Sequence, residues 1–162
     1  FPALSIAIAA SVFGAQAIGA GKVDLLNKVT RTALMMNIFF TGSLVILAYL
    51  FSKYLMALFI TDAAVVALGQ QLLFIVLWSI LFFGASAIFA SMMRASGTVT
   101  VPMLINIVAI VCIEIPCAYL FSQWWGLQGI WYAYALAFVS LCILQGLYYQ
   151  FVWKKKAIHA LI

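Results

Sequence analysis

The residue with the clearest capacity for chemistry is Glu114, a carboxylate inside a long apolar run. It stands in the segment CIEIPCAYL, two residues before Pro116, and no other acid lies within such a run. An ionisable side chain in lipid is costly and typically marks a proton site, a cation site or a gate. Glu114 is therefore a candidate ion-coupling or gating residue. Two structural alternatives stay open: a hydrogen bond to a neighbouring helix, or a carboxylate that reaches the outer interface.

Several neutral polar and aromatic residues in the apolar runs could line a cavity for a small molecule. The candidates are Gln16, Ser79, Phe83, Asn106 and Tyr132. Polar side chains of this kind also pair helices through hydrogen bonds, so both roles stay open. Aromatic faces attract cations. A pocket for flat cationic drugs could include Trp78, Phe82, Phe83, Tyr132 and Phe138.

Residues at the ends of the apolar runs have the character of interface anchors. Arg94 closes the third run at the predicted inner face, where it is an anchor or a gating contact. Tryptophan and tyrosine gather at both membrane interfaces as aromatic belts. We therefore place the following residues in two such belts: Trp124 and Trp125 on the outer side, and Tyr148, Tyr149 and Trp153 on the inner side.

The sequence offers no other constellation for catalysis or metal binding. The three cysteines lie in apolar runs, and the single His159 has no ligand set around it. The segment GAGK at 19–22 lacks the serine or threonine that a phosphate-binding loop requires. No Ser-His-Asp set or carboxylate pair is available, so we expect a protein that is not an enzyme and has no metal or cofactor.

Five long apolar stretches with few or no charges must position these residues. The composition is 69% hydrophobic and 7% charged, whereas soluble domains carry about 25% charged residues. Each stretch reaches the roughly 20 residues that a helix needs to cross a bilayer. The predicted spans are 3–21, 28–51, 63–95, 101–122 and 127–153. The fold class is therefore all-α, a polytopic membrane protein with five transmembrane helices.

The basic residues alternate between the gaps and so predict the orientation. Gaps one, three and five hold seven of the eight, and gap two holds only Lys53. Loops rich in Lys and Arg stay in the cytoplasm, so we expect residues 154–162 to form a cytoplasmic tail. In the loops that flank the membrane, the basic residues behind the net charge of +5 would meet anionic lipid headgroups. Outside these loops no basic face is left to bind nucleic acid.

Small residues and prolines predict local features of these spans. The segment GASAIFAS at 84–91 would let a neighbouring helix approach closely. Pro102 suits the first turn of the fourth helix, and Pro116 should kink it. The chain opens at Phe1-Pro2 within an apolar run, and five is an odd number of spans. We therefore expect a piece of a longer chain.

Several segments, in this order and spacing, resemble the second half of a multidrug and toxic compound extrusion (MATE) transporter. They cover nearly the whole chain and together are specific, although each alone would be weak. The segments are QAIGAGK at 16–22, LFITDAAVVALG at 58–69, SMMRASGTVTVPMLIN at 91–106, EIPCAYLFS at 114–122 and GLQGIWYAYALAF at 126–138.

The resemblance implies the fold and the activity of the MOP superfamily to which these transporters belong. Such proteins have twelve spans in two six-helix lobes and exchange cationic or amphipathic compounds for Na⁺ or H⁺ across the plasma membrane, in bacteria the inner membrane. The present chain would be the last five helices, with the N-terminal lobe as its partner. Because alternating access needs both lobes, we expect this piece alone to be inactive.

The chain departs from the family pattern at the coupling carboxylate. Some relatives carry this acid on the tenth helix, but residues 63–93 contain none, with Ser79 and Phe83 in the relevant stretch. Others carry it on the first helix, outside these residues. Glu114 matches an acid that some branches of the family carry before the proline of this helix, which implies a coupling role.

Two other functions stay open. A lipid-linked oligosaccharide flippase of the same superfamily needs a basic central cavity, but no Lys or Arg lies in the middle of a span. A non-transporting membrane assembly subunit is the other alternative.

Overall fold

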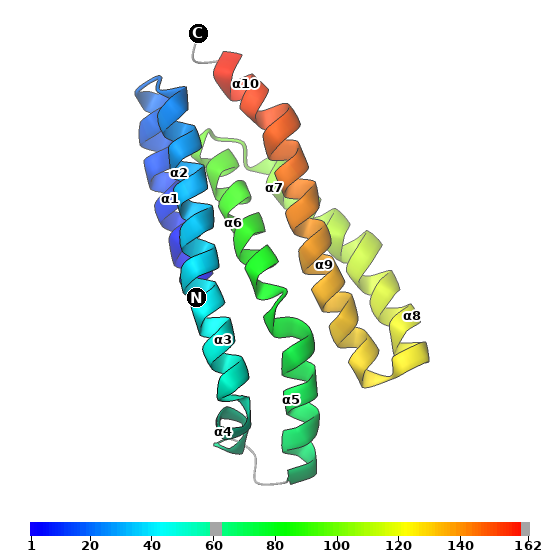
Figure 1. Ribbon diagram of the computed structural model, residues 1–162. Helices are drawn as coiled ribbons and strands as arrows, with labels where there is room; N and C mark the ends of the chain where they lie inside the picture. The colour runs from blue at the N-terminus through cyan, green and yellow to red at the C-terminus, as the bar shows by residue number, and fades with distance from the viewer. Residues whose placement is uncertain (59–62, 160–162) are drawn as a thin grey trace.

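The computed structural model describes residues 1–58 and 63–159, and every regular element in these residues is helical (Figure 1). Residues 59–62, within the segment LFITDAAVVALG, and residues 160–162 of the predicted tail lie outside the described ranges. The elements are α1 (Pro2–Gly19), α2 (Val23–Met36), α3 (Gly42–Leu50), α4 (Ser52–Ala57), α5 (Ala63–Leu77), α6 (Ile80–Ala95), α7 (Thr100–Val108), α8 (Ile115–Trp125), α9 (Leu127–Tyr148) and α10 (Lys154–His159). Three π-helical segments join some of them: η1 (Asn37–Thr41), η2 (Ala109–Glu114) and η3 (Tyr149–Trp153).

The five predicted transmembrane helices are confirmed. The described residues form candidate spans at Pro2–Gly19, Asp24–Leu50, Ala64–Ala95, Thr100–Trp125 and Leu127–Lys156. The second span begins earlier than predicted because the charged segment after Gly21 is helical from Val23 onward. The last span continues through η3 into α10, so the first residues of the predicted tail extend the helix.

Helix α6 lies at the centre of the packing. It contacts α1 along much of its length and also packs against α9 (Figure 1). Its buried face is built mainly from small and flexible residues: Gly84, Ser86, Ile88, Ala90, Ser91, Met92 and Met93. Small side chains let helix backbones approach closely in lipid, where van der Waals contact drives association. The close approach that the segment at 84–91 predicts is confirmed.

Glycines with a positive φ make the turns between spans. Gly97 (φ 83°) follows α6, and Gly126 (φ 59°) joins α8 to α9. Pro102 lies in the first turn of α7, as predicted, where its missing N–H is harmless. Ahead of Pro116 the helix changes to the π-helical segment η2. A proline cannot donate to the preceding turn, which accounts for an irregular hydrogen-bond ladder at this place.

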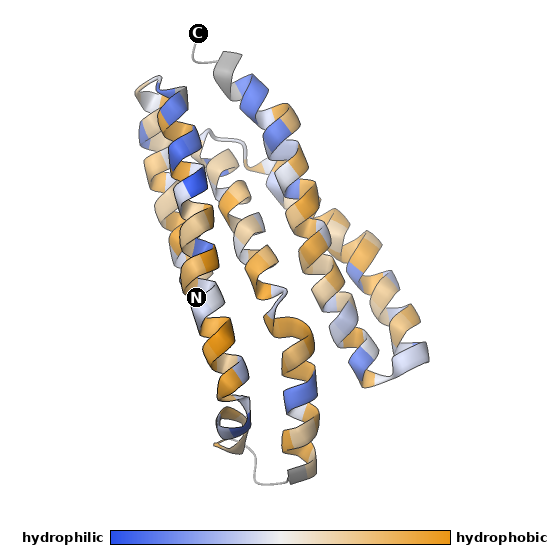
Figure 2. Ribbon diagram, in the orientation of Figure 1, coloured by the Kyte–Doolittle hydropathy of each residue, from blue (hydrophilic) through white to orange (hydrophobic). Residues whose placement is uncertain are grey.

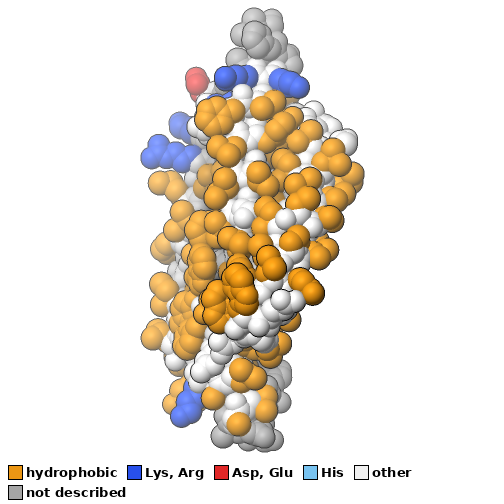
Figure 3. Space-filling model, turned by 90° about the vertical axis from the view of Figure 1, so that its right-hand side faces the viewer, with side chains coloured by type: hydrophobic (Ala, Val, Ile, Leu, Met, Phe, Trp, Pro, Cys, Tyr) orange, Lys and Arg blue, Asp and Glu red, His pale blue; other side chains and the backbone are white. Residues whose placement is uncertain are grey.

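The surface of the lobe is apolar between two charged ends. Figure 2 shows apolar residues along every span, and Figure 3 shows orange side chains over most of one face. The basic side chains gather at one end, which we call the basic end. It carries Lys22, Lys28 and Arg31 at and after the start of α2, Arg94 in the last turn of α6, and Lys154–Lys156 on α10 (Figure 1). Lys53 lies on α4, at the opposite end (Figure 1). This arrangement is that of an integral membrane protein.

Candidate functional site

The third span is interrupted between α5 and α6, near its middle. Ser79 is fully buried at the interruption, and its backbone N–H donates to the carbonyl oxygen of Val76 at 2.9 Å. Its hydroxyl donates to the same carbonyl at 2.6 Å. Irregular backbone at membrane depth is tolerated where protein or a cavity surrounds it. The predicted candidate Ser79 therefore stabilises a break in the helix.

A polar bridge from the second span supports the helix just after this break. The Asn37 side-chain amide donates to the carbonyl oxygen of Leu81 at 3.1 Å, and the Thr41 hydroxyl donates to the Asn37 side-chain oxygen at 3.0 Å. Gly84 permits the approach, because a Cβ there would collide with that same Asn37 oxygen. Asn37 and Thr41 are buried in η1. We use the name Asn37 bridge for Asn37, Thr41 and the Leu81 carbonyl group that they support.

An aromatic hollow opens beside the break, toward α8 and α9. It measures about 610 Å³ and contains Trp78, Phe121, Trp125 and Tyr132 among its walls. The Trp125 and Tyr132 ring centroids lie 6.0 Å apart. At one edge the Gln128 side-chain amide donates to the Gln71 side-chain oxygen at 3.0 Å. Tyr132, one of the predicted cavity-lining residues, lies in the wall of this hollow, and its role in binding a small molecule stays a prediction.

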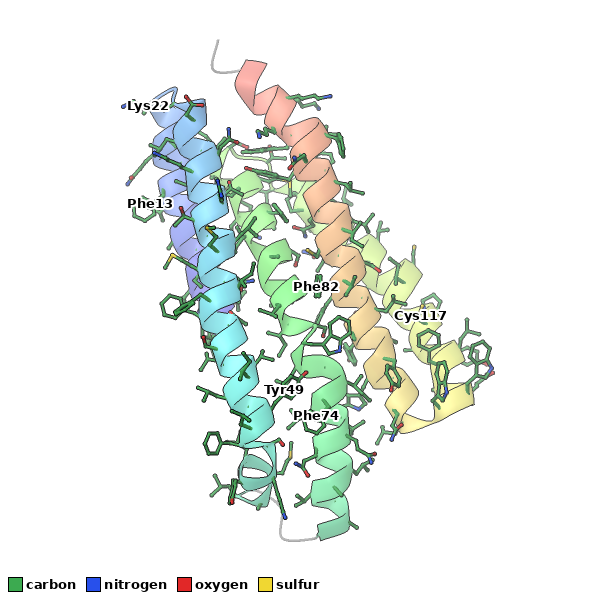
Figure 4. All side chains as sticks on the ribbon, viewed as in Figure 1. Phe13, Lys22, Tyr49, Phe74, Phe82 and Cys117 are labelled. Carbon is green, nitrogen blue, oxygen red and sulfur yellow. The ribbon has the colours of Figure 1, made fainter. Side chains whose placement is uncertain are left out.

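Other aromatic residues near the break pair with one another. Phe82 packs edge-on against Trp78, with centroids 5.8 Å apart, and Phe83 lies 5.1 Å from Phe138. Figure 4 shows Phe82 beside the break, and Tyr49 facing Phe74 between α3 and α5. The Tyr49 and Phe74 ring centroids are 5.1 Å apart. The five predicted aromatic residues therefore divide between the hollow and the pairs beside it.

Glu114 stands apart from the hollow, at the end of η2. Its side chain is half-buried, and among the described residues it has no hydrogen-bond partner. The span that carries it is the least enclosed of the five, with 6% of its most apolar stretch buried. A carboxylate in this position can accept a proton or bind a cation, and its role stays a prediction.

The remaining predicted candidates lie closer to the basic end. Asn106 on α7 accepts a hydrogen bond from the Gln145 side-chain amide at 3.3 Å, which joins α7 to α9. Among the residues that the structure describes, the buried Gln145 side-chain oxygen has no hydrogen-bond partner. Gln16 is exposed near the end of α1. Arg94 is exposed in the last turn of α6, where its guanidinium donates to the Ser91 hydroxyl at 2.8 Å.

Two residues assigned to the inner aromatic belt are instead buried in the protein. Tyr149 and Trp153 are 3% and 2% exposed and stack with centroids 5.0 Å apart. The Tyr149 and Thr30 hydroxyls share a hydrogen bond of 2.8 Å, and the Trp153 indole N–H donates to the Ser96 hydroxyl at 2.8 Å. The belt assignment was wrong for these two because η3 turns them toward α2 and α6. We call Tyr149 and Trp153, with their partners Thr30 and Ser96, the aromatic lock.

Comparison with known proteins decides the family. The MatE family model matches residues 1–120. The chain belongs to the MatE family. It is 46% identical to the probable multidrug resistance protein YoeA of Bacillus subtilis, over 99% of this chain and 35% of that protein. It is 26% identical to the human multidrug and toxin extrusion protein 1, over 91% of this chain and 26% of that protein. The chain thus spans about a third or less of these MatE relatives.

Solved structures agree on the fold of this MatE chain. The crystal structure of the eukaryotic MATE transporter AtDTX14 superposes with a TM-score of 0.84 at 22% identity, over 99% of this chain and 37% of that one. The crystal structure of the Vibrio cholerae MATE transporter VcmN in the bent form superposes with a TM-score of 0.76 at 20% identity, over 90% of this chain and 32% of that one. The five spans are therefore arranged as in part of a MATE transporter.

Proposed function

We propose that the chain forms most of the C-terminal lobe of a multidrug efflux antiporter in the plasma membrane, with its basic end in the cytoplasm. The observation that carries this proposal is the 46% identity to a probable multidrug resistance protein over 99% of the chain. The basic end supports the orientation, because Lys and Arg gather on the cytoplasmic side. The substrates that we propose are small cationic or amphipathic compounds, and the human relative's name as a multidrug and toxin extrusion protein supports small molecules in general.

In this function the lobe works with an N-terminal lobe through alternating access. Binding of Na⁺ or H⁺ biases one of two states, and the substrate is released in the other. Trp78 and Tyr132 present aromatic faces in a hollow that also suits amphipathic molecules. No basic residue lies in the middle of a span, so no observation favours the flippase alternative.

Glu114 is the residue of this lobe to which we assign ion coupling or gating. It is the one carboxylate within the described spans that is away from both charged ends. Its π-helical segment belongs to a class of irregularity that is frequent at functional sites. A carboxylate there can exchange a proton or a Na⁺ ion while the lobes change state.

The test is drug efflux by the full-length transporter with Glu114→Gln, measured over a range of pH and Na⁺ concentration. We expect transport to fall at least tenfold, or to lose its dependence on pH or Na⁺, at normal membrane expression. Asp24→Asn is the matched control, because Asp24 is an exposed acid near the basic end. Unchanged transport in Glu114→Gln would exclude Glu114 from coupling and leave it a packing role.

A second test addresses the need for two lobes. Residues 1–162 expressed alone should confer no drug resistance, because a cavity between lobes requires both of them. The full-length protein at the same expression level is the control. Resistance from these residues alone would contradict the two-lobe mechanism and favour an independent assembly.

A further inference from the structure

A long apolar groove runs between α1 and α2, outside every site described above. It measures about 640 Å³. Its walls include Ile6, Ala10, Phe13, Val29, Ala33 and Met36. Its two hydroxyl-bearing wall residues are Ser5, whose hydroxyl donates to the carbonyl oxygen of Phe1, and Thr32. The groove therefore suits a hydrocarbon chain.

The groove adjoins a charged hollow at the basic end. Lys22 and Lys28 line this second hollow, which also measures about 640 Å³, together with Asp24. Leu25 and Lys28 belong to the walls of both spaces, so the two spaces adjoin each other. Figure 4 shows Lys22 at the end of the helix pair and Phe13 further along α1.

The charge at this mouth is positive. Two lysines face one carboxylate in the hollow, and Arg31 lies one helical turn beyond Lys28 on the exposed side of α2. Figure 3 shows basic side chains outnumbering acidic ones at this end. Each Lys or Arg near an anionic membrane surface contributes about 1 kcal/mol of attraction. The mouth is therefore complementary to a phosphate group with a net negative charge.

The apolar part of the groove is short enough to lie within one leaflet of a bilayer. Beyond Lys28, the walls on α2 run from Val29 to Met36, an advance of seven residues, or about 10 Å at 1.5 Å per residue. The hydrocarbon core of a bilayer is about 30 Å thick, so half of it is about 15 Å. The charged hollow thus lies at headgroup depth when the apolar walls lie at acyl-chain depth.

We propose that the space between α1 and α2 is a binding site for one anionic phospholipid of the leaflet at the basic end. Lys22 and Lys28 contact the headgroup phosphate, and one acyl chain lies along Ile6, Phe13 and Val29. The apolar walls distinguish this ligand from a free phosphate ion, and the two lysines distinguish it from a zwitterionic lipid.

The test is native mass spectrometry of the purified full-length transporter with equal amounts of phosphatidylglycerol and phosphatidylcholine that carry the same acyl chains. We expect preferential retention of phosphatidylglycerol. Lys22→Gln with Lys28→Gln should weaken it by about fivefold per lysine, which corresponds to about 1 kcal/mol each. Lys155→Gln with Lys156→Gln is the matched control, because these exposed lysines lie on α10, away from the groove.

Two further arms separate the lipid from other occupants. Ala9→Phe, at an exposed groove residue, should lower retention of both lipids by filling the acyl-chain path. Inorganic phosphate at millimolar concentration should leave bound phosphatidylglycerol in place. Three results would each overturn the proposal. They are an equal loss of phosphatidylglycerol retention in the two double-lysine variants, displacement of phosphatidylglycerol by phosphate, and retention that is unchanged when Lys22 and Lys28 are replaced. The last result would be expected if another segment of the full-length protein filled the groove.

Discussion

The π-helical segments η2 and η3 have the same backbone irregularity and opposite surroundings. In η3 the segment buries Tyr149 and Trp153, whereas in η2 it buries only Ala109 and leaves Glu114 half-exposed. The span with η3 is 28% buried over its most apolar stretch, against 6% for the span with η2. Backbone geometry therefore does not decide the role of a segment. The neighbouring helices and the residue types decide it.

The difference separates a packed body from a peripheral helix. Around η3, the aromatic lock joins α2, α6 and the end of the last span through two hydrogen bonds and stacked rings. Around η2, packing against other spans within the described residues is mostly with α9, since α7 and α8 continue the same helix. A carboxylate on a peripheral helix can change its partners between states more easily than one inside the lock.

The largest expected effect is the loss of Trp153. Trp153→Ala should destabilise the full-length protein by about 3–5 kcal/mol, because it removes a buried ring that stacks on Tyr149. Trp124→Ala on α8 is the control, since its side chain is 68% exposed and its loss should cost little. Thermal unfolding in detergent, followed by size-exclusion chromatography, measures both. Equal effects would remove the distinction between the packed body and the periphery.

An intermediate effect is expected at the Asn37 bridge. Gly84→Ala should destabilise by about 1–3 kcal/mol, because the added Cβ collides with the buried Asn37 side chain. Gly42→Ala is the matched control in the neighbouring α3, where a Cβ has ordinary contact with Leu81 at 3.8 Å. The same unfolding assay reports both variants. A Gly84→Ala protein as stable as Gly42→Ala would show that the bridge can move aside without loss.

The smallest expected effect is the removal of one hydroxyl. Tyr149→Phe loses the hydrogen bond to Thr30 and should destabilise by about 0.6 kcal/mol, the average for interhelical hydrogen bonds in a membrane protein, and by at most about 1.7 kcal/mol. Tyr119→Phe on α8 is the control, because Tyr119 is 65% exposed. If Tyr119→Phe had the larger effect in the unfolding assay, the lock would not be a principal contact of the lobe.

The spans could be predicted because bilayer thickness fixes the length of an apolar helix, and the stretches without charge show that length directly. The aromatic lock could not be predicted, since tyrosine and tryptophan at positions such as 149 and 153 are also the residue types of an aromatic belt that faces lipid. Only the rotation of η3 toward α2 and α6 separates the two cases. Asn37 escaped notice because a lone amide in an apolar run does not name its partner. The pair of Asn37 with Gly84 would have been the signal.

The close approach at Gly84 also constrains how related sequences can change. A residue with a Cβ at position 84 fits only if position 37 becomes smaller, because the two share the same space. Each single replacement should therefore be harmful, while the combined replacement by Ala at position 84 and Ser at position 37 should be tolerated. Homologous sequences should accordingly show the two positions covarying, with an amide at 37 appearing only opposite glycine.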